Sequence, residues 1–251
     1  MERRFFLAGV LATAAFGMKG AAEERNVVLA SNEVYPLLYH EGERLTGYLF
    51  DLISEAARRG GIPVEIRSMP WARCVEETRS GGIDGLFVTF HTAERDSYMA
   101  FPSEPLMVQR ICLYARQGSG IRYGGHLEEL SALRIAVSNR VSNGPNFDEA
   151  VRKGLLSNLE PVNGPESMVR MLLGGRVDLM VLHDLEADGL LRRLGAADQV
   201  IKLSPPLDEV PGYIAFTRQR DTAPVMAAFD RALAEMRRDG SYRRLQEVYF
   251  P

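Results

Sequence analysis

The sequence predicts an α/β protein built from two similar lobes, and a repeated pattern is the first observation behind this prediction. In the first half of the chain a helix-like run ends at residues 81–84 (Gly-Gly-Ile-Asp), and a strand-like run follows over 85–89. In the second half an apolar run over 168–173 leads to residues 174–178 (Gly-Gly-Arg-Val-Asp) and then to a strand-like run over 179–182. Each copy predicts a helix that stops at glycine, a short turn and a buried strand. Two such units predict a cleft between lobes, where small ligands bind.

The order of elements in the first half is the second observation. Strand patterns over Val27–Ala30, Val64–Arg67 and Gly85–Thr89 alternate with helix patterns over Tyr48–Arg59 and Trp71–Ser80. Glycines end the first helix and a proline begins the second, as helix boundaries require. This alternation predicts right-handed crossovers and a mainly parallel sheet flanked by helices.

The second half repeats the alternation and then returns to the first lobe. A strand over 108–115 begins it, a second α/β unit ends near Leu203, and a strand over 212–217 with two final helices remains. The simplest account is that the chain crosses to the second lobe near Pro105 and returns near Pro205. Two crossings make a hinge, which permits closure on a ligand. The predicted divisions are 23–107 for the first part of lobe 1, 108–205 for lobe 2, and 206–251 for the return to lobe 1.

The first residues predict an export signal. Arg3 and Arg4 precede an apolar run over 5–16, and small residues follow at 20–22, so we expect a signal peptide over 1–22. The apolar run is too short to be a stable membrane anchor. The arginine pair fits a twin-arginine route, and an ordinary signal that happens to carry two arginines is an equal alternative. Either route predicts a periplasmic protein.

Composition indicates a soluble globular protein without a nucleic-acid partner. The chain has 251 residues, 46% of them hydrophobic and 25% charged, with a net charge of −3. It has no basic stripe interleaved with aromatic residues. Cys74 falls in a helix pattern and Cys112 in a strand pattern, so we expect free, buried thiols instead of a disulfide. Two distant cysteines do not make a zinc site, and no metal or other cofactor is expected.

Charged residues follow the two repeat strands and predict a binding site. In an open α/β sheet, ligands bind beyond the carboxyl ends of the strands. Arg95 follows the first repeat strand and Asp184 directly follows the second, so a cation and an anion would face a shared cleft. A guanidinium can clamp a carboxylate and an aspartate can accept from an ammonium, which suits a zwitterion. The alternative is a surface arginine and an aspartate that caps the next helix.

Two segments close to Arg95 carry a resemblance to a known family. Residues 87–95 (Phe-Val-Thr-Phe-His-Thr-Ala-Glu-Arg) and 101–105 (Phe-Pro-Ser-Glu-Pro) resemble the signature of bacterial extracellular solute-binding proteins of the polar amino-acid type, family 3. Residues 181–184, 212–216 and 239–242 are similar to its second-lobe strand end, return strand and last helices. The likeness covers nearly the whole mature chain. It implies a two-lobed, type II periplasmic-binding-protein-like fold with two crossover hinge segments.

The resemblance also implies roles for individual residues. Arg95 would grip the α-carboxylate of the ligand, and Asp184 would bind its α-amino group. Trp71 and Tyr35 fall where the family places aromatic rings against the ligand. Such rings supply apolar area and can stack on a cation. A core aromatic at a helix start is the alternative for Trp71.

The chain departs from the family pattern at two turns. Thr89 keeps a hydroxyl at the end of the first repeat strand, but Phe90 occupies the usual hydroxyl site nearer the ligand. In lobe 2 a segment from Ser138 to Gly144 replaces a more glycine-rich turn, which changes how closely the backbone can approach an anion. Within it, Arg140 either supplies a second cation or faces solvent. A second cation would suit a ligand with an extra acidic group.

These observations predict a monomeric periplasmic solute-binding protein that captures an amino acid or a similar small polar or acidic solute. It would deliver that solute to the membrane permease of an ABC transporter. An enzyme on the same scaffold, similar to the cyclohexadienyl dehydratases, is the alternative, with His91, His183 and Glu33 as available acid–base groups. No nucleophile elbow or His-Glu-x-x-His motif is present, so we expect a protein that is not an enzyme. A sensory binding module is the third reading.

Overall fold

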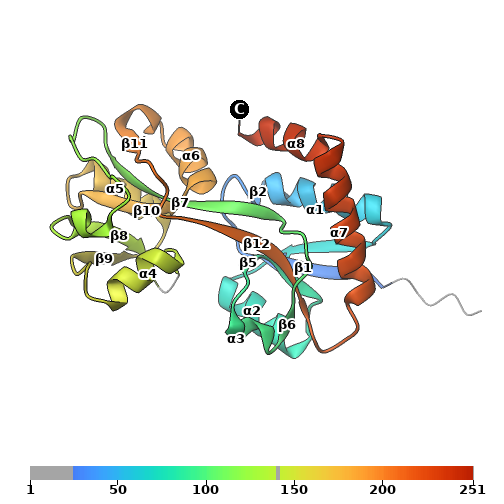
Figure 1. Ribbon diagram of the computed structural model, residues 1–251. Coiled ribbons are helices and arrows are strands. Elements are labelled where there is room, and N and C mark those ends of the chain that lie inside the picture. The colour runs from blue at the N-terminus through green and yellow to red at the C-terminus, as the bar shows by residue number, and fades with distance from the viewer. Residues whose placement is uncertain (1–24, 140–141, 251) are drawn as a thin grey trace, which may run out of the picture.

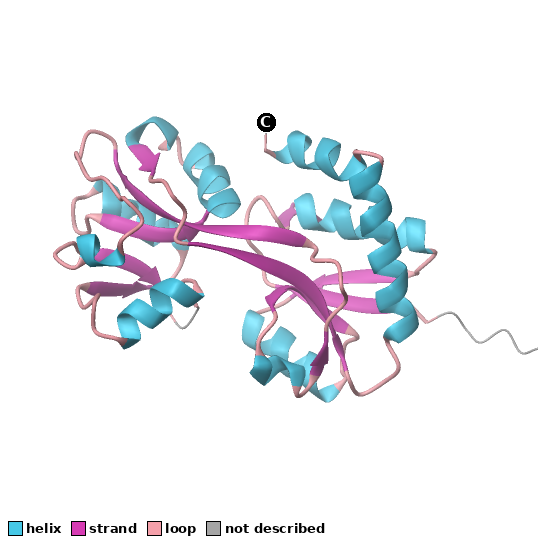
Figure 2. Cartoon of the chain, in the orientation of Figure 1, coloured by secondary structure: helices cyan, strands magenta, loops and turns pink. Residues whose placement is uncertain are grey.

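The computed structural model describes residues 25–139 and 142–250, which form two lobes joined by a pair of long strands (Figures 1 and 2). The predicted signal peptide, with Arg3 and Arg4, lies outside the described residues, and so does Arg140. Within the described part, no helix combines the length and the apolar character needed to cross a membrane.

Lobe 1 is assembled from elements at both ends of the described chain (Figure 1). Its strands are β1 (Val27–Ser31), β2 (Tyr39–Glu41), β3 (Arg44–Thr46), β4 (Val64–Ser68), β5 (Gly85–Phe90) and β6 (Met99–Ala100). Its helices are α1 (Tyr48–Gly60), α2 (Trp71–Ser80), α3 (Ala93–Asp96), α7 (Ala223–Arg238) and α8 (Ser241–Tyr249).

Lobe 2 is a continuous insertion into lobe 1. Its strands are β8 (Ile135–Ser138), β9 (Leu159–Val162), β10 (Leu179–His183) and β11 (Val200–Lys202). Its helices are α4 (Pro145–Arg152), α5 (Pro165–Leu173) and α6 (Asp184–Arg193), with short 3-10 turns η1 (Leu127–Leu130) and η2 (Ala197–Gln199). Two long strands, β7 (Met107–Arg116) and β12 (Asp208–Thr217), belong to both lobes.

One sheet continues across both lobes in the order β4-β1-β5-β12-β7-β10-β8-β9, with β6 against β12 and β11 against β7. Strands β4, β1 and β5 are parallel, and so are β10, β8 and β9. Strands β7 and β12 run antiparallel to each other and to their outer neighbours β10 and β5. Each lobe therefore has the parallel sheet that the alternation of elements predicts, and an antiparallel pair joins the two.

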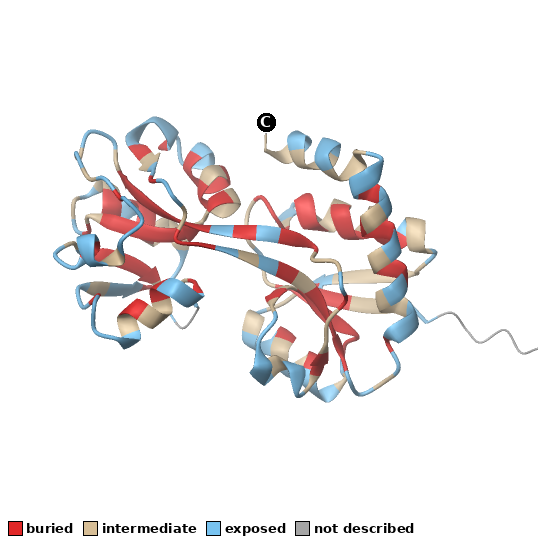
Figure 3. Ribbon diagram, viewed as in Figure 1, coloured by how far each residue is buried: buried red, intermediate tan, exposed pale blue. Residues whose placement is uncertain are grey.

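The joining pair is a thin ribbon in which exposed and buried side chains mix (Figure 3). Residues 107–111 of β7 pair with residues 208–212 of β12. Val108 is 52% exposed, and Arg110 Nε donates to Glu209 Oε1 at 2.8 Å across the pair. Because the described chain crosses between the lobes only through these two strands, the ribbon has the character of a hinge.

Each lobe buries apolar side chains on both faces of its sheet. In lobe 2, Met180 and Leu182 of β10 pack with α5 and α6, whereas Leu179 and Val181 pack on the opposite face with α4. The division follows the pleat, since successive side chains of a strand point to opposite faces. Lobe 1 is divided in the same way, with α1 and α7 on one face and α2 on the other. This double coverage explains the continuous apolar runs of the repeat strands.

The repeated pattern occupies the same place in both lobes. Gly81 ends α2 with a left-handed φ of 80°, and Gly175 adopts a φ of 69° after α5. Asp84 Oδ2 accepts from the backbone N–H of Val28 at 2.8 Å. Asp178 Oδ2 accepts from the backbone N–H of Arg134 at 2.9 Å. The repeat aspartate thus ties its strand to the amino end of the neighbouring strand, which is an architectural role.

The two cysteines are free and buried, as predicted. Burial raises the pKa of the Cys74 thiol to about 11 and that of the Cys112 thiol to about 11. The short elements β2, β3, β6, β9 and α3 are additions to the predicted set. Strand β9 contains Pro161 and lies at the sheet edge, where proline is tolerated but the strand pattern in the sequence is weak.

Candidate functional site

A cavity of about 830 Å³ lies between the lobes, at the carboxyl ends of β5 and β10. This size suits a small-molecule ligand. Gln109 and Ile111 of the joining strand β7 contribute to its wall. Lobe 1 contributes polar and aromatic side chains, including Glu33, Tyr35, Tyr39, Trp71, Thr89, Phe90 and Arg95. Lobe 2 contributes polar and charged side chains, including Ser138, Asn163, Glu166, Arg170, His183, Glu186 and Arg193.

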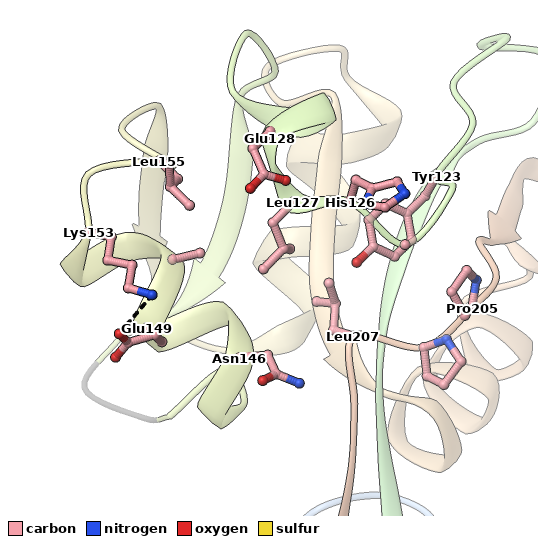
Figure 4. A pocket seen from close by; sticks show the side chains of 13 residues that line it. Tyr123, His126, Leu127, Glu128, Asn146, Glu149, Lys153, Leu155, Pro205 and Leu207 are labelled. Atoms are coloured by element: carbon pink, nitrogen blue, oxygen red, sulfur yellow. Dashed lines mark ion pairs between the residues drawn. The ribbon is translucent and has the colours of Figure 1, made fainter.

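A second hollow of about 340 Å³ lies within lobe 2 (Figure 4). Tyr123, His126, Glu128 and Pro205 line it, and two further lining residues, Glu149 and Lys153, pair with each other at 3.3 Å. None of the binding residues predicted from the sequence lies there. The larger cavity, which both lobes share, is therefore the candidate site.

The larger cavity brings together most of the predicted binding residues. The predicted residues that line it are Tyr35, Trp71, Thr89, Phe90, Arg95 and Ser138. Arg140 lies outside the described residues, and Asp184 lies outside the cavity lining. Lobe 1 thus presents all its predicted groups to the cavity, whereas lobe 2 presents Ser138 and not Asp184.

Arg95 is held in place by backbone and aromatic contacts. It lies in α3, whose N-terminal residue Thr92 accepts a hydrogen bond from the Arg95 N–H at 3.3 Å. Arg95 Nη1 donates to the Phe90 carbonyl at 2.8 Å, and its guanidinium carbon lies 5.9 Å from the Trp71 ring centroid. No described carboxylate forms an ion pair with it. The remaining N–H groups of this half-buried guanidinium are available to an anionic ligand.

Thr89 carries an unsatisfied polar group on the cavity wall. Its side chain is 1% exposed, and its hydroxyl has no hydrogen-bond partner among the described residues. Buried polar atoms are almost always paired, so an unpaired one beside a cavity indicates a ligand or water partner. Thr89 and Arg95 together make lobe 1 the side that suits a carboxylate.

Aromatic and apolar contacts connect the lobes beside the cavity. The Tyr35 ring lies 4.8 Å from that of Tyr39, and the Arg193 guanidinium carbon of lobe 2 lies 4.9 Å from the Tyr35 centroid. At Gly189 in α6, an added Cβ would come within 2.3 Å of Pro36 Cδ in lobe 1. The glycine therefore permits α6 to approach this loop of lobe 1 closely.

Asp184 is buried and does not line the cavity. Its Oδ1 accepts from the Leu185 N–H at 2.8 Å, and its Oδ2 lies 4.0 Å from Arg110 Nη1. Burial raises the pKa of its carboxyl. The residue before it is the N-cap of α6, so Asp184 is the first helical residue instead of the cap. The structure brings other side chains of this segment to the cavity.

His183 and Glu186 are the residues of this segment that line the cavity. His183 Nδ1 is buried without a partner among the described residues, and burial lowers the pKa of the imidazole to about 4. The His183 ring centroid lies 6.2 Å from that of Phe90, so the ends of β5 and β10 meet here. Burial raises the pKa of Glu186 to about 7. Glu186 lies three residues after His183. This i, i+3 spacing places two residues on the same side of a helix, so it is a sequence signal that could have identified Glu186.

The remaining charges on the lobe 2 wall are paired. Arg170 Nη1 lies 3.7 Å from Glu166 Oε2, and Arg193 Nη2 donates to Glu166 Oε1. Glu186 has no hydrogen-bond or ion-pair partner in the part of the chain that the structure describes. It is therefore the lobe 2 carboxyl that remains available to a ligand.

The other acid–base candidates differ in position. His91 is exposed, lies 2.6 Å from Asp96 Oδ1 through Nε2, and does not line the cavity. Glu33 lines the cavity but accepts from Ser68 Oγ at 2.9 Å and lies 2.9 Å from His40 Nδ1. Within residues 25–139 and 142–250, no group of three or more metal-ligating side chains is present.

Comparison with known proteins identifies the class to which this fold and cavity belong. The family model of bacterial extracellular solute-binding proteins, family 3, matches residues 27–251, and the chain belongs to this family. A relative, the L-cystine-binding protein TcyA of Bacillus subtilis (strain 168), is 22% identical over 217 residues, which are 86% of this chain and 77% of TcyA.

Solved structures support the fold. An ancestral arginine-binding protein bound to arginine superposes with a TM-score of 0.71 at 22% identity, over 89% of this chain and 97% of that one. A histidine kinase sensor domain with similarity to periplasmic binding proteins superposes with a TM-score of 0.73 at 20% identity, over 90% and 96% of the two chains. These likenesses show the two-lobed periplasmic-binding-protein fold predicted from the sequence.

Proposed function

We propose that this protein captures an amino acid or a similar small polar solute between its lobes and delivers it to the permease of an ABC transporter. The observation that carries the proposal is Arg95, which lies in the shared cavity without a carboxylate partner among the described residues. A family whose members include proteins named for binding cystine supports the same ligand class.

The cavity suits such a ligand in both its charged and its apolar parts. Arg95 would clamp a carboxylate, and the Thr89 hydroxyl would hydrogen-bond beside it. Tyr35, Trp71 and Phe90 supply ring surface for the apolar part of the solute. Rotation about the β7–β12 ribbon would close the lobes and exclude water, which strengthens each polar contact.

Binding without turnover is part of this proposal. Transport requires that the solute leave unchanged, and the cavity holds no nucleophile–base pair among its described residues. We also propose that the protein works as a monomer in the periplasm. Export by the signal over 1–22, by either the general or the twin-arginine route, remains a prediction that N-terminal sequencing of the exported protein tests.

The test is calorimetric titration of the mature protein with each of the twenty L-amino acids. Arg95→Ala should weaken the tightest ligand by at least about thirtyfold, since removal of a hydrogen-bonded charge from a binding site costs about 2–5 kcal/mol. Arg44→Ala is the matched control, because Arg44 is exposed in lobe 1 and outside the cavity. Wild-type affinity in the Arg95 variant, or formation of a product from the bound solute, would overturn the proposal.

A further inference from the structure

Resting on the proposed function, we propose that Glu186 is the specificity residue that holds an ammonium group of the solute against lobe 2. This role falls to Glu186 instead of Asp184, although the sequence pattern favours Asp184. Three properties of Glu186 support it: its place on the cavity wall, the lack of a partner, and the neutrality of its neighbour His183.

The position of Glu186 is the first step. It lies in the first turn of α6, and its side chain keeps part of its surface exposed to the cavity. No described group donates to it or forms an ion pair with it. A buried carboxylate without a donor is costly, so a cationic ligand group would relieve that cost on binding.

The neighbours of Glu186 are the second step. Besides Glu186, the charged or titratable groups on the cavity wall are Glu33, Tyr35, Tyr39 and Arg95 from lobe 1, and Glu166, Arg170, His183 and Arg193 from lobe 2. The two lobe 2 arginines are paired with Glu166. His183 is neutral near pH 7, because burial lowers the pKa of its imidazole to about 4. The described lobe 2 wall of the cavity therefore lacks an unpaired cation that would neutralise Glu186 in place of a ligand.

The orientation of Asp184 is the third step. Its carboxyl is already engaged by the Leu185 N–H and lies near Arg110, and neither Asp184 nor Arg110 lines the cavity. Successive helical residues are separated by about 100°, so positions 184 and 186 point in very different directions. A solute in the cavity can therefore meet the carboxyl of Glu186 and not that of Asp184.

A proton linkage follows from the same geometry. Burial alone raises the pKa of Glu186 to about 7, so the empty cavity holds this carboxyl partly protonated at neutral pH. An ammonium binds the ionised form, and the proton must leave as the ligand enters. The affinity for an amine-bearing solute should therefore fall as the pH drops below 7, by up to about tenfold per unit.

The experiment compares two isosteric variants on the same helix, Glu186→Gln and Asp184→Asn. The probes are the tightest-binding L-amino acid and analogues in which a hydroxyl replaces each amino group in turn. We expect Glu186→Gln to weaken the amino acid at least about tenfold, to leave at least one analogue unaffected, and to remove the pH dependence between pH 6 and pH 8. Asp184→Asn should stay within about twofold of the wild type.

The outcomes separate this inference from the proposed function. Unchanged amino-acid affinity and pH dependence in Glu186→Gln would overturn the role of Glu186, and so would a larger loss in Asp184→Asn. If Arg95→Ala loses binding, the proposed function stands even when one of these two outcomes overturns the role of Glu186. If the wild type binds none of the amino acids, the proposed function fails first. Circular dichroism of both variants controls for folding.

Discussion

The two lobes share one structural unit, a helix, a turn and a strand, and they differ in the residues that follow this strand. In both, a helix stops at glycine, and an aspartate ties the next strand to its parallel neighbour through a backbone N–H. Beyond the strands, lobe 1 presents the Arg95 guanidinium, and lobe 2 presents the carboxyl of Glu186 and the neutral ring of His183. The repeat therefore explains how each lobe folds, and the differences explain what the cavity can bind.

The first prediction concerns the repeat aspartates and carries the largest expected effect. Asp84 is 6% exposed and is bonded by Arg25, Arg220 and the Val28 N–H, whereas Asp178 is more exposed and bonded by Arg134. Asp84→Ala should lower the free energy of unfolding by about 3–5 kcal/mol, since it leaves the Val28 N–H and the guanidinium groups of Arg25 and Arg220 without their buried acceptor. Asp178→Ala should cost about 1–2 kcal/mol. Urea denaturation measures both, and equal losses would contradict the ranking.

The second prediction compares one cavity carboxyl from each lobe in the unliganded protein. The pKa of Glu186 is raised above the unfolded value, so its ionisation destabilises the fold progressively as the pH rises from about 4.5 to about 7. Glu186→Gln should therefore stabilise the protein at pH 8 by about 1–3 kcal/mol, with little gain at pH 4. Glu33→Gln is the lobe 1 control, because that carboxylate has Ser68 and His40 as partners. Thermal unfolding at both pH values checks this, and a gain that does not grow with pH would contradict it.

The third prediction tests the contact between the lobes. Gly189→Ala places a Cβ against Pro36, so the lobes should close less completely and bind the solute about tenfold more weakly. The stability of the unliganded protein should not fall, because alanine is favoured over glycine within a helix by about 1 kcal/mol. Calorimetry and thermal unfolding measure the two effects separately. Arg192→Ala on the exposed side of α6 is the control, and wild-type affinity in the Gly189 variant would refute the contact.

The smallest expected effect concerns the single cysteine in each lobe. Burial raises the thiol pKa of both Cys74 and Cys112 to about 11, so the reactive thiolate is scarce at pH 8 in either lobe. A thiol reagent should modify the folded protein slowly and the unfolded protein at two sites. Fast labelling of one cysteine in the native protein would show that its lobe opens locally.

Local sequence patterns were sufficient to predict the two lobes, the parallel order of their strands and the lobe 1 half of the cavity. Helix and strand periodicity reflects neighbouring residues, and the carboxyl end of a parallel strand has a known relation to the cleft. Thr89 and Phe90 could be placed by this reasoning because they are the last residues of β5, and Arg95 because it lies in the short helix α3 that follows β5. The weak edge strand β9 and the hairpin of β2 and β3 carry too little periodicity to be predicted in this way.

The lobe 2 half of the cavity depends on long-range packing. Asp184 and Glu186 lie two residues apart, and the sequence favours the one nearer the strand. The start of α6, its packing on β10 and its approach to Pro36 set the rotation of the helix, which directs Glu186 into the cavity and Asp184 away from it. A rotation of about 100° per residue makes this choice sensitive to contacts from both lobes. Sequence spacing therefore located the acidic segment, and the packing of α6 selects the carboxyl that faces a ligand.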